Sequence, residues 1–108
     1  MYDDNNIFAK IIRGEAPSAK VFESAHSLAF NDKFPNARTH ILVVPKGPYE
    51  DIADFTARAP AEEQLDFWKA VLSVAKKAGV RNNFRLQANT GKGAGQAVPH
   101  FHVHILSN

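Results

Sequence analysis

The first regular pattern along the chain is a helical stripe of apolar residues near the N-terminus. Its members, spaced so that they share one side of a helix, are Ile7, Phe8, Ile11 and Ile12. Asn5 and Asn6 stand just before the stripe, where an amide side chain can cap a helix, and Gly14 stands where a helix commonly ends. We therefore predict a short helix over Asn5–Arg13.

A second helix is predicted over Pro60–Ala78. Proline suits the first turn of a helix, two glutamates follow it, and two lysines precede Gly79 at the other end. The apolar stripe of this helix consists of Leu65, Trp68, Val71, Leu72 and Ala75. We expect this stripe to face the core, with Trp68 as a core anchor.

Five short segments, separated by turn residues, each predict a strand. They are Lys20–Glu23, Ser27–Asn31, Thr39–Pro45, Asn83–Ala88 and His100–Leu106. The first two are joined by so few residues that we expect a hairpin, and the other connections are mostly short as well. The fold class predicted from these elements is α+β, with about five antiparallel strands and two helices.

The composition narrows the class of protein. With 108 residues the chain has room for one domain, which we place over residues 1–108. The absence of cysteine excludes disulfides and cysteine nucleophiles and fits a reducing compartment, so we expect a cytoplasmic protein. The polar start is not a secretory signal, and no apolar run is long enough to cross a membrane. The net charge is +2 with scattered basic residues, so we expect no duplex nucleic acid partner.

Three of the five histidines, His100, His102 and His104, alternate along the last predicted strand. Alternate residues of a strand share one face, so the three imidazoles are expected to form a row. A polar outer face that is rich in histidine without further function is one interpretation. A metal site is another, but the outer two rings would lie about 13 Å apart, no cysteine is available, and no carboxylate lies nearby in the sequence.

A phosphate centre fits this row of histidines better than a metal does. Free imidazole has a pKa of about 6.5, so it is mostly neutral at pH 7 and is a good nucleophile toward phosphorus. A protonated neighbour can donate to the leaving group, which contributes about 100- to 10,000-fold to the rate. The preceding loop, residues 89–96, holds three of the six glycines, whose amides can approach an anion closely.

The segment Gly95–Leu106, which reads GQAVPHFHVHIL, resembles the signature of the histidine triad (HIT) superfamily. Three earlier segments, IFAKIIRGE from residue 7, LAFND from residue 28 and THILVVPK from residue 39, are similar to the Hint branch of histidine triad nucleotide-binding proteins. The resemblance covers nearly the whole chain. It implies a HIT-like α+β fold, with a five-stranded antiparallel sheet and two helices, and a homodimer whose sheet is continuous across the interface.

The resemblance also implies catalytic roles for four histidines. His102 corresponds to the nucleophile, which forms a nucleotidyl-histidine intermediate. His100 and His104 correspond to its flanking partners, and His40 to a fourth histidine packed beside them. Asp32 corresponds to the carboxylate that binds the ribose hydroxyls, and an ionised carboxylate can accept two such hydrogen bonds.

The remaining positions implied by the resemblance hold the base and the phosphate. The apolar walls for a purine correspond to Ile7, Phe8, Ile11 and Phe30. Lys33 stands beside the ribose and base at a position that is usually apolar. The phosphate loop corresponds to Asn89 and to the backbone of Gly95, Gln96 and Ala97. Ala97 stands where many Hint proteins have serine.

The activity that the resemblance implies is hydrolysis of purine nucleoside phosphoramidates or related adenylyl conjugates, with release of a nucleoside monophosphate such as AMP. We expect no metal and no other cofactor. Two alternatives stay open. One is a dinucleoside polyphosphate hydrolase on the same fold, and the other is a nucleotide-binding regulatory module with little turnover.

Overall fold

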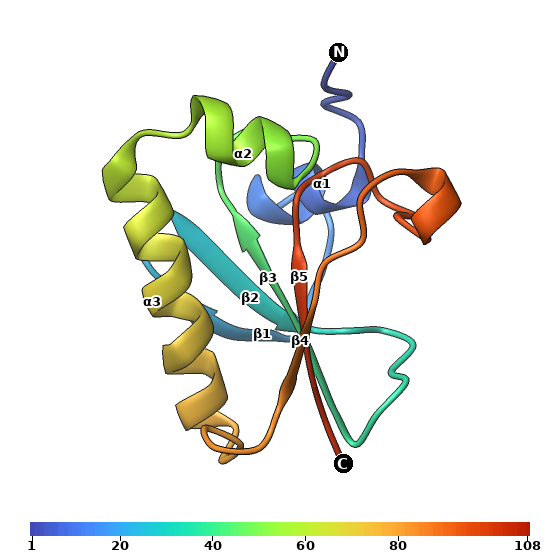
Figure 1. Ribbon diagram of the computed structural model, residues 1–108. Coiled ribbons are helices and arrows are strands. Elements are labelled where there is room, and N and C mark those ends of the chain that lie inside the picture. Colours follow the sequence, from blue (N-terminus) through green and yellow to red (C-terminus); the bar gives the residue numbers. More distant parts are fainter.

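Five antiparallel strands form one sheet in the order β1-β2-β3-β5-β4 (Figure 1). The computed structural model describes residues 1–108. The strands are β1 (Lys20–Glu23), β2 (Ser27–Asn31), β3 (Thr39–Pro45), β4 (Arg85–Gln87) and β5 (Val103–Ser107). The first three have the predicted bounds, and β4 is shorter than predicted. The predicted α+β class with a five-stranded antiparallel sheet is confirmed.

The two predicted helices are present, and the structure adds a third between them. The helices are α1 (Ile7–Ile12), α2 (Ile52–Arg58) and α3 (Ala61–Lys77), with a 3₁₀ turn η1 (Lys92–Ala94) in the glycine loop. The cap of α2 is Asp51, whose side chain accepts from the amide of Asp54. A helix this short carries too few apolar positions to show a clear period in the sequence. No helix is both long and apolar enough to span a membrane.

The last predicted strand, His100–Leu106, is corrected because β5 begins only at Val103. The amide of His100 donates to a carbonyl two residues earlier at 2.9 Å, and the amide of Phe101 donates to a carbonyl in the loop before α2 at 2.7 Å. These amides are therefore not available for the sheet. Of the three alternating histidines, only His104 lies within a strand.

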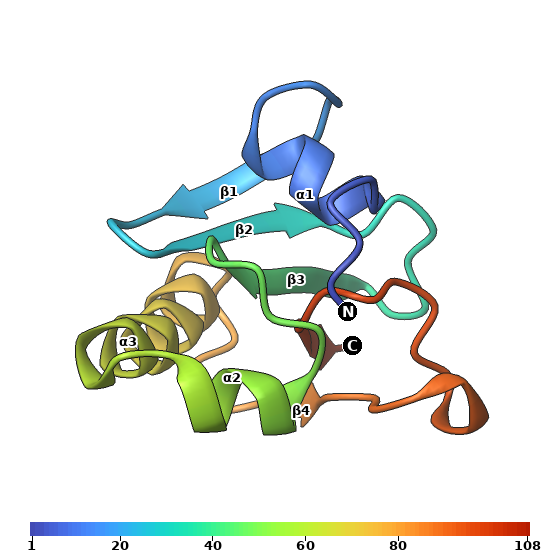
Figure 2. The same cartoon turned by 90° about the horizontal axis from the view of Figure 1, so that it is seen from above.

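The largest group of buried side chains lies between the sheet and the helices α2 and α3. Its centre is aromatic, because the ring centroids of Phe55, Phe67 and Phe101 lie between 5.0 and 5.2 Å apart. A smaller apolar cluster lies on the other face of the sheet and consists of Phe8, Leu28, Phe30, Leu42 and Val44. Figure 2 shows α3 on one side of the sheet and α1 on the other. Both faces of the central strands are thus covered.

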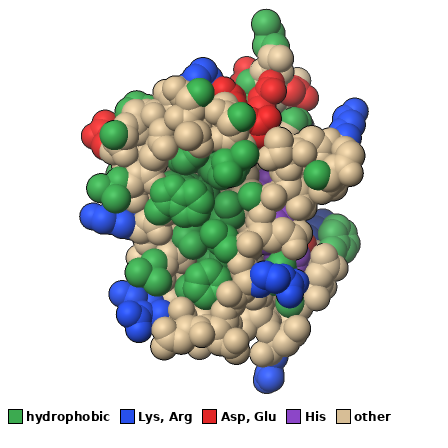
Figure 3. Space-filling model, in the orientation of Figure 1, with side chains coloured by type: hydrophobic (Ala, Val, Ile, Leu, Met, Phe, Trp, Pro, Cys, Tyr) green, Lys and Arg blue, Asp and Glu red, His purple; other side chains and the backbone are tan.

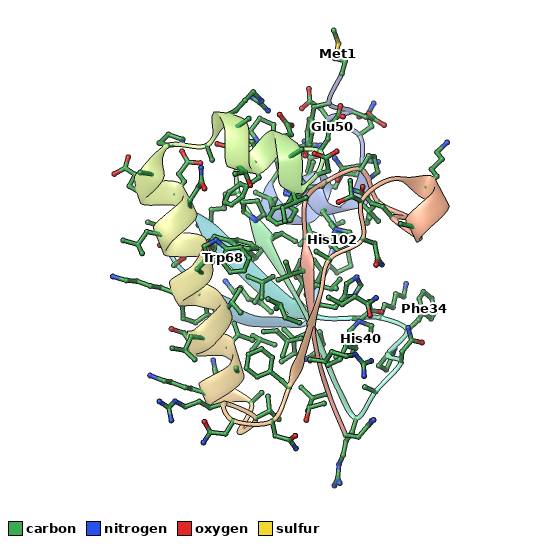
Figure 4. The ribbon with its side chains drawn as sticks, viewed as in Figure 1. Met1, Phe34, His40, Glu50, Trp68 and His102 are labelled. Atoms are coloured by element: carbon green, nitrogen blue, oxygen red, sulfur yellow. The ribbon has the colours of Figure 1, made fainter.

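Trp68 is not the core anchor that the helical stripe predicted. It is 43% exposed, whereas its neighbour Phe67 is fully buried. The buried face of α3 includes Val71 and Ala75 of the predicted stripe, but Phe67 lies on it in place of Trp68. Trp68 therefore belongs to an exposed surface on α3 and β4 (Figures 3 and 4), which we call the α3–β4 apolar surface. Its exposed members are Leu65, Trp68, Leu72 and Leu86.

A carboxylate on α3 holds the hairpin between β1 and β2 in place. One oxygen of Asp66 accepts from the hydroxyls of Ser24 and Ser27, at 2.7 and 2.8 Å. Burial, the largest single influence, opposes ionisation of this carboxyl, but the two hydroxyl bonds together with the backbone amide and charge of His26 hold the pKa of Asp66 below its usual range. The hairpin thus depends on one ionised side chain from a distant part of the chain.

Replacing Asp66 with alanine should lower the free energy of unfolding by about 1–3 kcal/mol at pH 7, because two part-buried hydroxyls lose their acceptor. The folded-state pKa of Asp66 is lowered, so its contribution is full above the unfolded pKa and is lost as the pH falls through the folded value. Urea denaturation at several pH values should show that the free energies of unfolding of the variant and the wild type become equal in acid. Glu62→Ala, an exposed change on the same helix, is the control. A difference that stays constant into acid would contradict this account.

Candidate active site

A cleft of about 300 Å³ opens on the sheet face opposite α3, and we call it the histidine cleft. Figure 4 shows His40 and His102 on the other side of the sheet from Trp68. The predicted site residues that line the cleft are Phe8, Asp32, His40, Asn89, Gly95, Ala97, His102 and His104. Lining residues that the sequence did not predict are Asn36, Leu42, Arg85, Gln87, Val98 and Leu106.

The ring of His102 is held in one orientation by a backbone carbonyl. Its Nδ1 lies 2.7 Å from the carbonyl oxygen of His100. A carbonyl can only accept, so Nδ1 carries the proton, and Nε2 of a neutral ring then carries a lone pair. The edge of the ring meets Phe8, with centroids 4.9 Å apart. Nε2 has no hydrogen-bond partner in the protein, and the residue lines the cleft.

His40 and His104 form a hydrogen-bonded pair whose direction is also set by the backbone. The amide of Asn36 donates to Nδ1 of His40 at 3.0 Å, and Nε2 of His40 lies 2.9 Å from Nδ1 of His104. Because an amide can only donate, neutral His40 carries its proton on Nε2 and donates it to His104. Neutral His104 then carries its own proton on Nε2, which is buried and has no partner. The pair therefore presents an unused N–H beside His102.

Burial keeps the alternating histidines neutral. It lowers the pKa of His100 to about 4 and that of His104 to about 4, and in His104 the nearby His102 and His40 add to the effect. Burial also lowers the pKa of His102, although its bond to the His100 carbonyl and the charge of Asp32 act in the opposite direction. At neutral pH the nucleophilic form of imidazole therefore predominates at His102.

His100 lies outside the cleft, fully buried, with both ring nitrogens bonded. Its Nε2 donates to the carbonyl of Pro45 at 2.8 Å, so its Nδ1 accepts from the hydroxyl of Tyr2 at 2.6 Å. The Tyr2 ring also meets the imidazole edge to face, with centroids 5.6 Å apart. His100 thus acts on the cleft through its backbone carbonyl, which orients His102. Tyr2 was missed because no local pattern links it to a residue at the opposite end of the chain.

The four predicted base-binding positions beside Phe8 do not line the cleft. Phe30 is buried in the apolar cluster with Phe8, and Ile11 packs against that cluster. Ile7 is 47% exposed. Lys33 is exposed, and its ammonium lies 5.9 Å from the centroid of the Phe34 ring. Ile7 and Ile11 lie on α1, Phe30 on β2 and Lys33 in the β2–β3 loop, so any purine contact with these side chains lies outside the histidine cleft.

Gln96 shapes the glycine loop and does not face the cleft. Its side-chain oxygen accepts from the amide of Gly91, and its amide group donates to the carbonyls of Glu50 and Val98. Gly95 has a φ of 90°, which a residue with a side chain rarely adopts. As a result the loop turns back toward the histidines. The amides of Ala97 and Val98, both at the cleft, donate to no group in the protein.

Asp32 borders both the cleft and the histidine pair. One carboxylate oxygen accepts from the amide of Phe34 at 2.7 Å, and the other lies 3.4 Å from Nε2 of His40. The side chain remains 19% exposed and lines the cleft. Asp32, His40 and His104 are close enough together to hold a metal ion. The facing nitrogens of the two histidines are hydrogen-bonded to each other, so a metal would have to replace that bond.

The chain matches the model of the HIT domain over residues 13–108. It is 50% identical over 107 residues to an uncharacterized HIT-like protein from Azospirillum brasilense, a match that covers 98% of this chain and 88% of that protein. Among solved structures it is similar to a HIT family hydrolase from Clostridium thermocellum, with a TM-score of 0.88, 34% identity, and coverage of 98% of this chain and 92% of that one. It is also similar to a histidine triad nucleotide-binding protein from Candida albicans, with a TM-score of 0.84, 30% identity, and coverage of 94% and 73%.

Stability should fall as the pH is lowered from about 6.5 toward 4, because His100 and His104 bind protons in the unfolded chain before they do so in the folded one. Because burial lowers their pKa in the folded state, these two histidines make their full contribution to stability above their pKa in the unfolded chain. That contribution is lost as the pH falls through their folded-state pKa. Nitrogen-15 NMR of the rings should show both still neutral at pH 5.5. Titration of either ring with a midpoint near 6.5 would contradict this prediction.

Proposed function

This chain belongs to the HIT family, and on that premise we propose that it hydrolyses purine nucleoside phosphoramidates or related adenylyl conjugates. The observation that carries the proposal is that two neutral imidazoles lie side by side in one cleft, one with a free hydrogen-bond acceptor and the other with a free donor. His102 offers a lone pair on Nε2, and His104 offers an unused N–H. A nucleophile and a hydrogen-bond donor side by side suit displacement at phosphorus, because the donor can offset charge that develops as the bond to the leaving group breaks.

In the first step, Nε2 of His102 attacks the α-phosphorus, the bond from phosphorus to the leaving nitrogen breaks, and the departing amine takes up a proton. The N–H of neutral His104 is a hydrogen-bond donor that the cleft offers to this nitrogen, and the proton that the amine takes up comes from solvent. In the second step, water attacks the nucleotidyl-histidine. Its oxygen joins phosphorus, His102 leaves with its lone pair restored, one proton of the water stays on the product phosphate, and the other returns to solvent.

Binding of the phosphate is supported by groups at the wall of the cleft. The amides of Ala97 and Val98 have no partner in the protein, and they can donate to phosphate oxygens. Asn89 and Gly95 line the same wall. For the nucleoside, the partly exposed carboxylate of Asp32 suits ribose hydroxyls. Ile7, Phe8, Ile11, Phe30 and Lys33 are proposed to border the purine. No step in this scheme needs a metal ion.

We also propose that two copies of the chain associate through the α3–β4 apolar surface. Strand β4 is at the edge of the sheet, and Leu86 on it is paired with Ile105, whose side chain lies in the core beneath α3. Leu86 therefore faces the same side as Trp68. A second copy that pairs its own β4 antiparallel to this edge would extend the sheet and cover both side chains.

His102→Ala should lower the turnover of adenosine 5′-phosphoramidate by at least about 1,000-fold, because the nucleophile is lost. Release of AMP is measured in the presence of a chelator, which also tests the expectation that no metal is needed. His26→Ala, which removes a histidine outside the cleft, is the matched control and should keep the wild-type rate.

Three outcomes separate the alternatives. Equal rates for wild type and His102→Ala would defeat the assignment of the nucleophile. Preferential turnover of a dinucleoside polyphosphate in competition would favour that class of hydrolase. Nucleotide binding without turnover of either substrate would favour the regulatory module.

Trp68→Glu and Leu86→Glu should each convert a dimer into a monomer in sedimentation velocity, because a charge would be buried without a partner. Phe34→Glu changes a side chain that is 76% exposed outside this surface, and it should leave the dimer intact. A wild-type protein that sediments as a monomer at every concentration would refute the dimer.

A further inference from the structure

A second cavity of about 390 Å³ continues from the histidine cleft. The two share part of their wall, namely Asn36, Arg85 and Leu106. Either cavity alone lies at the low end of the range of about 300–1,000 Å³ that is typical of ligand pockets. A nucleotide joined to a leaving group needs more room than the histidine cleft provides, and the adjoining cavity supplies it.

The sheet register places two polar side chains of β4 next to His104 on the way into this second cavity. Gln87 is paired directly with His104, and Arg85 is paired with Leu106. Residues paired in an antiparallel sheet share a face, so both side chains lie on the cleft side of β4, opposite Leu86. Leu106 follows His104 at a distance of about 7 Å along the strand. Arg85 therefore lies one step along the strand beyond His104.

The guanidinium of Arg85 has no hydrogen bond and no ion pair within the protein, and the residue is exposed on β4. Among the residues that line the second cavity, Arg85 is the only one with a charged side chain. The rest of its polar wall is neutral and consists of Asn36, Asn83, Ser107 and Asn108. A single free positive charge in a neutral polar cavity favours an anionic ligand.

We propose that the second cavity binds the leaving group and that Arg85 selects a leaving amine that carries a carboxylate. The inference rests on the proposed function and specifies its substrate class. In this arrangement the phosphorus lies at His102, the breaking bond to nitrogen lies near Nε2 of His104, and the rest of the amine extends past Gln87. The planar guanidinium suits a carboxylate, because it can donate two parallel hydrogen bonds to it.

The test compares two adenosine phosphoramidates with leaving amines of equal length, 4-aminobutyrate and its carboxamide. For the wild type, kcat/KM should favour the carboxylate by about 2- to 5-fold, the range expected for an exposed ion pair. Arg85→Gln should bring the ratio to about one, and Arg85→Lys should retain part of it. Arg81→Gln, which removes an exposed arginine outside both cavities, should keep the wild-type ratio. The wild-type preference should also shrink as salt is added.

A wild-type ratio of about one, or a preference that Arg85→Gln leaves unchanged, would overturn the leaving-group site while turnover of both substrates still supported the hydrolase. Failure of the proposed function gives a different result, namely no turnover of either substrate, or turnover that His102→Ala does not reduce. The ratio of the two substrates is insensitive to a loss of folded protein, since both rates would fall together.

Discussion

The hydrogen bond from Nδ1 of His102 to the carbonyl of His100, 2.7 Å long, is the constraint on which the cleft depends. A backbone carbonyl accepts and never donates, so this bond decides which nitrogen of the ring faces the cleft with a lone pair. The amide of Asn36 does the reverse for His40, since it can only donate. Two backbone groups of opposite polarity thus give neutral His102 a lone pair on Nε2 and neutral His104 an N–H on Nε2. Side chains alone would leave both tautomers accessible.

Burial and hydrogen bonding act together on the neighbouring His100, and they give it a structural role. A fully buried imidazole is stable only when both nitrogens have partners, and Tyr2 and Pro45 provide them. The ring is therefore fixed, and its carbonyl is fixed with it. This explains how a histidine outside the cleft orients the nucleophile. The N-terminal segment contributes through Tyr2, although it comes from the opposite end of the chain.

The parts of the fold with a local pattern could be predicted from the sequence, and the parts set by distant partners could not. The bounds of β1, β2 and β3 follow from short β-rich runs between turn residues. The side of α3 that is buried depends on Phe55 and Phe101, which lie far from Phe67 in sequence, so the prediction for Trp68 was wrong. The spacing of the histidines located the cleft, but backbone partners and the cross-strand neighbours on β4 require the sheet register.

Strand β4 has only three residues, and its successive side chains point to opposite faces of the sheet. Leu86 faces the side of α3, where an apolar surface is exposed, while Arg85 and Gln87 face the cleft beside Leu106 and His104. Because the period of a strand is two, a shift of register by one residue would exchange these faces. Any contact that holds the edge of β4 in register, including a second copy of the chain, would therefore also hold Arg85 at the mouth of the cleft. If both proposals hold, assembly and choice of leaving group are coupled through one short strand.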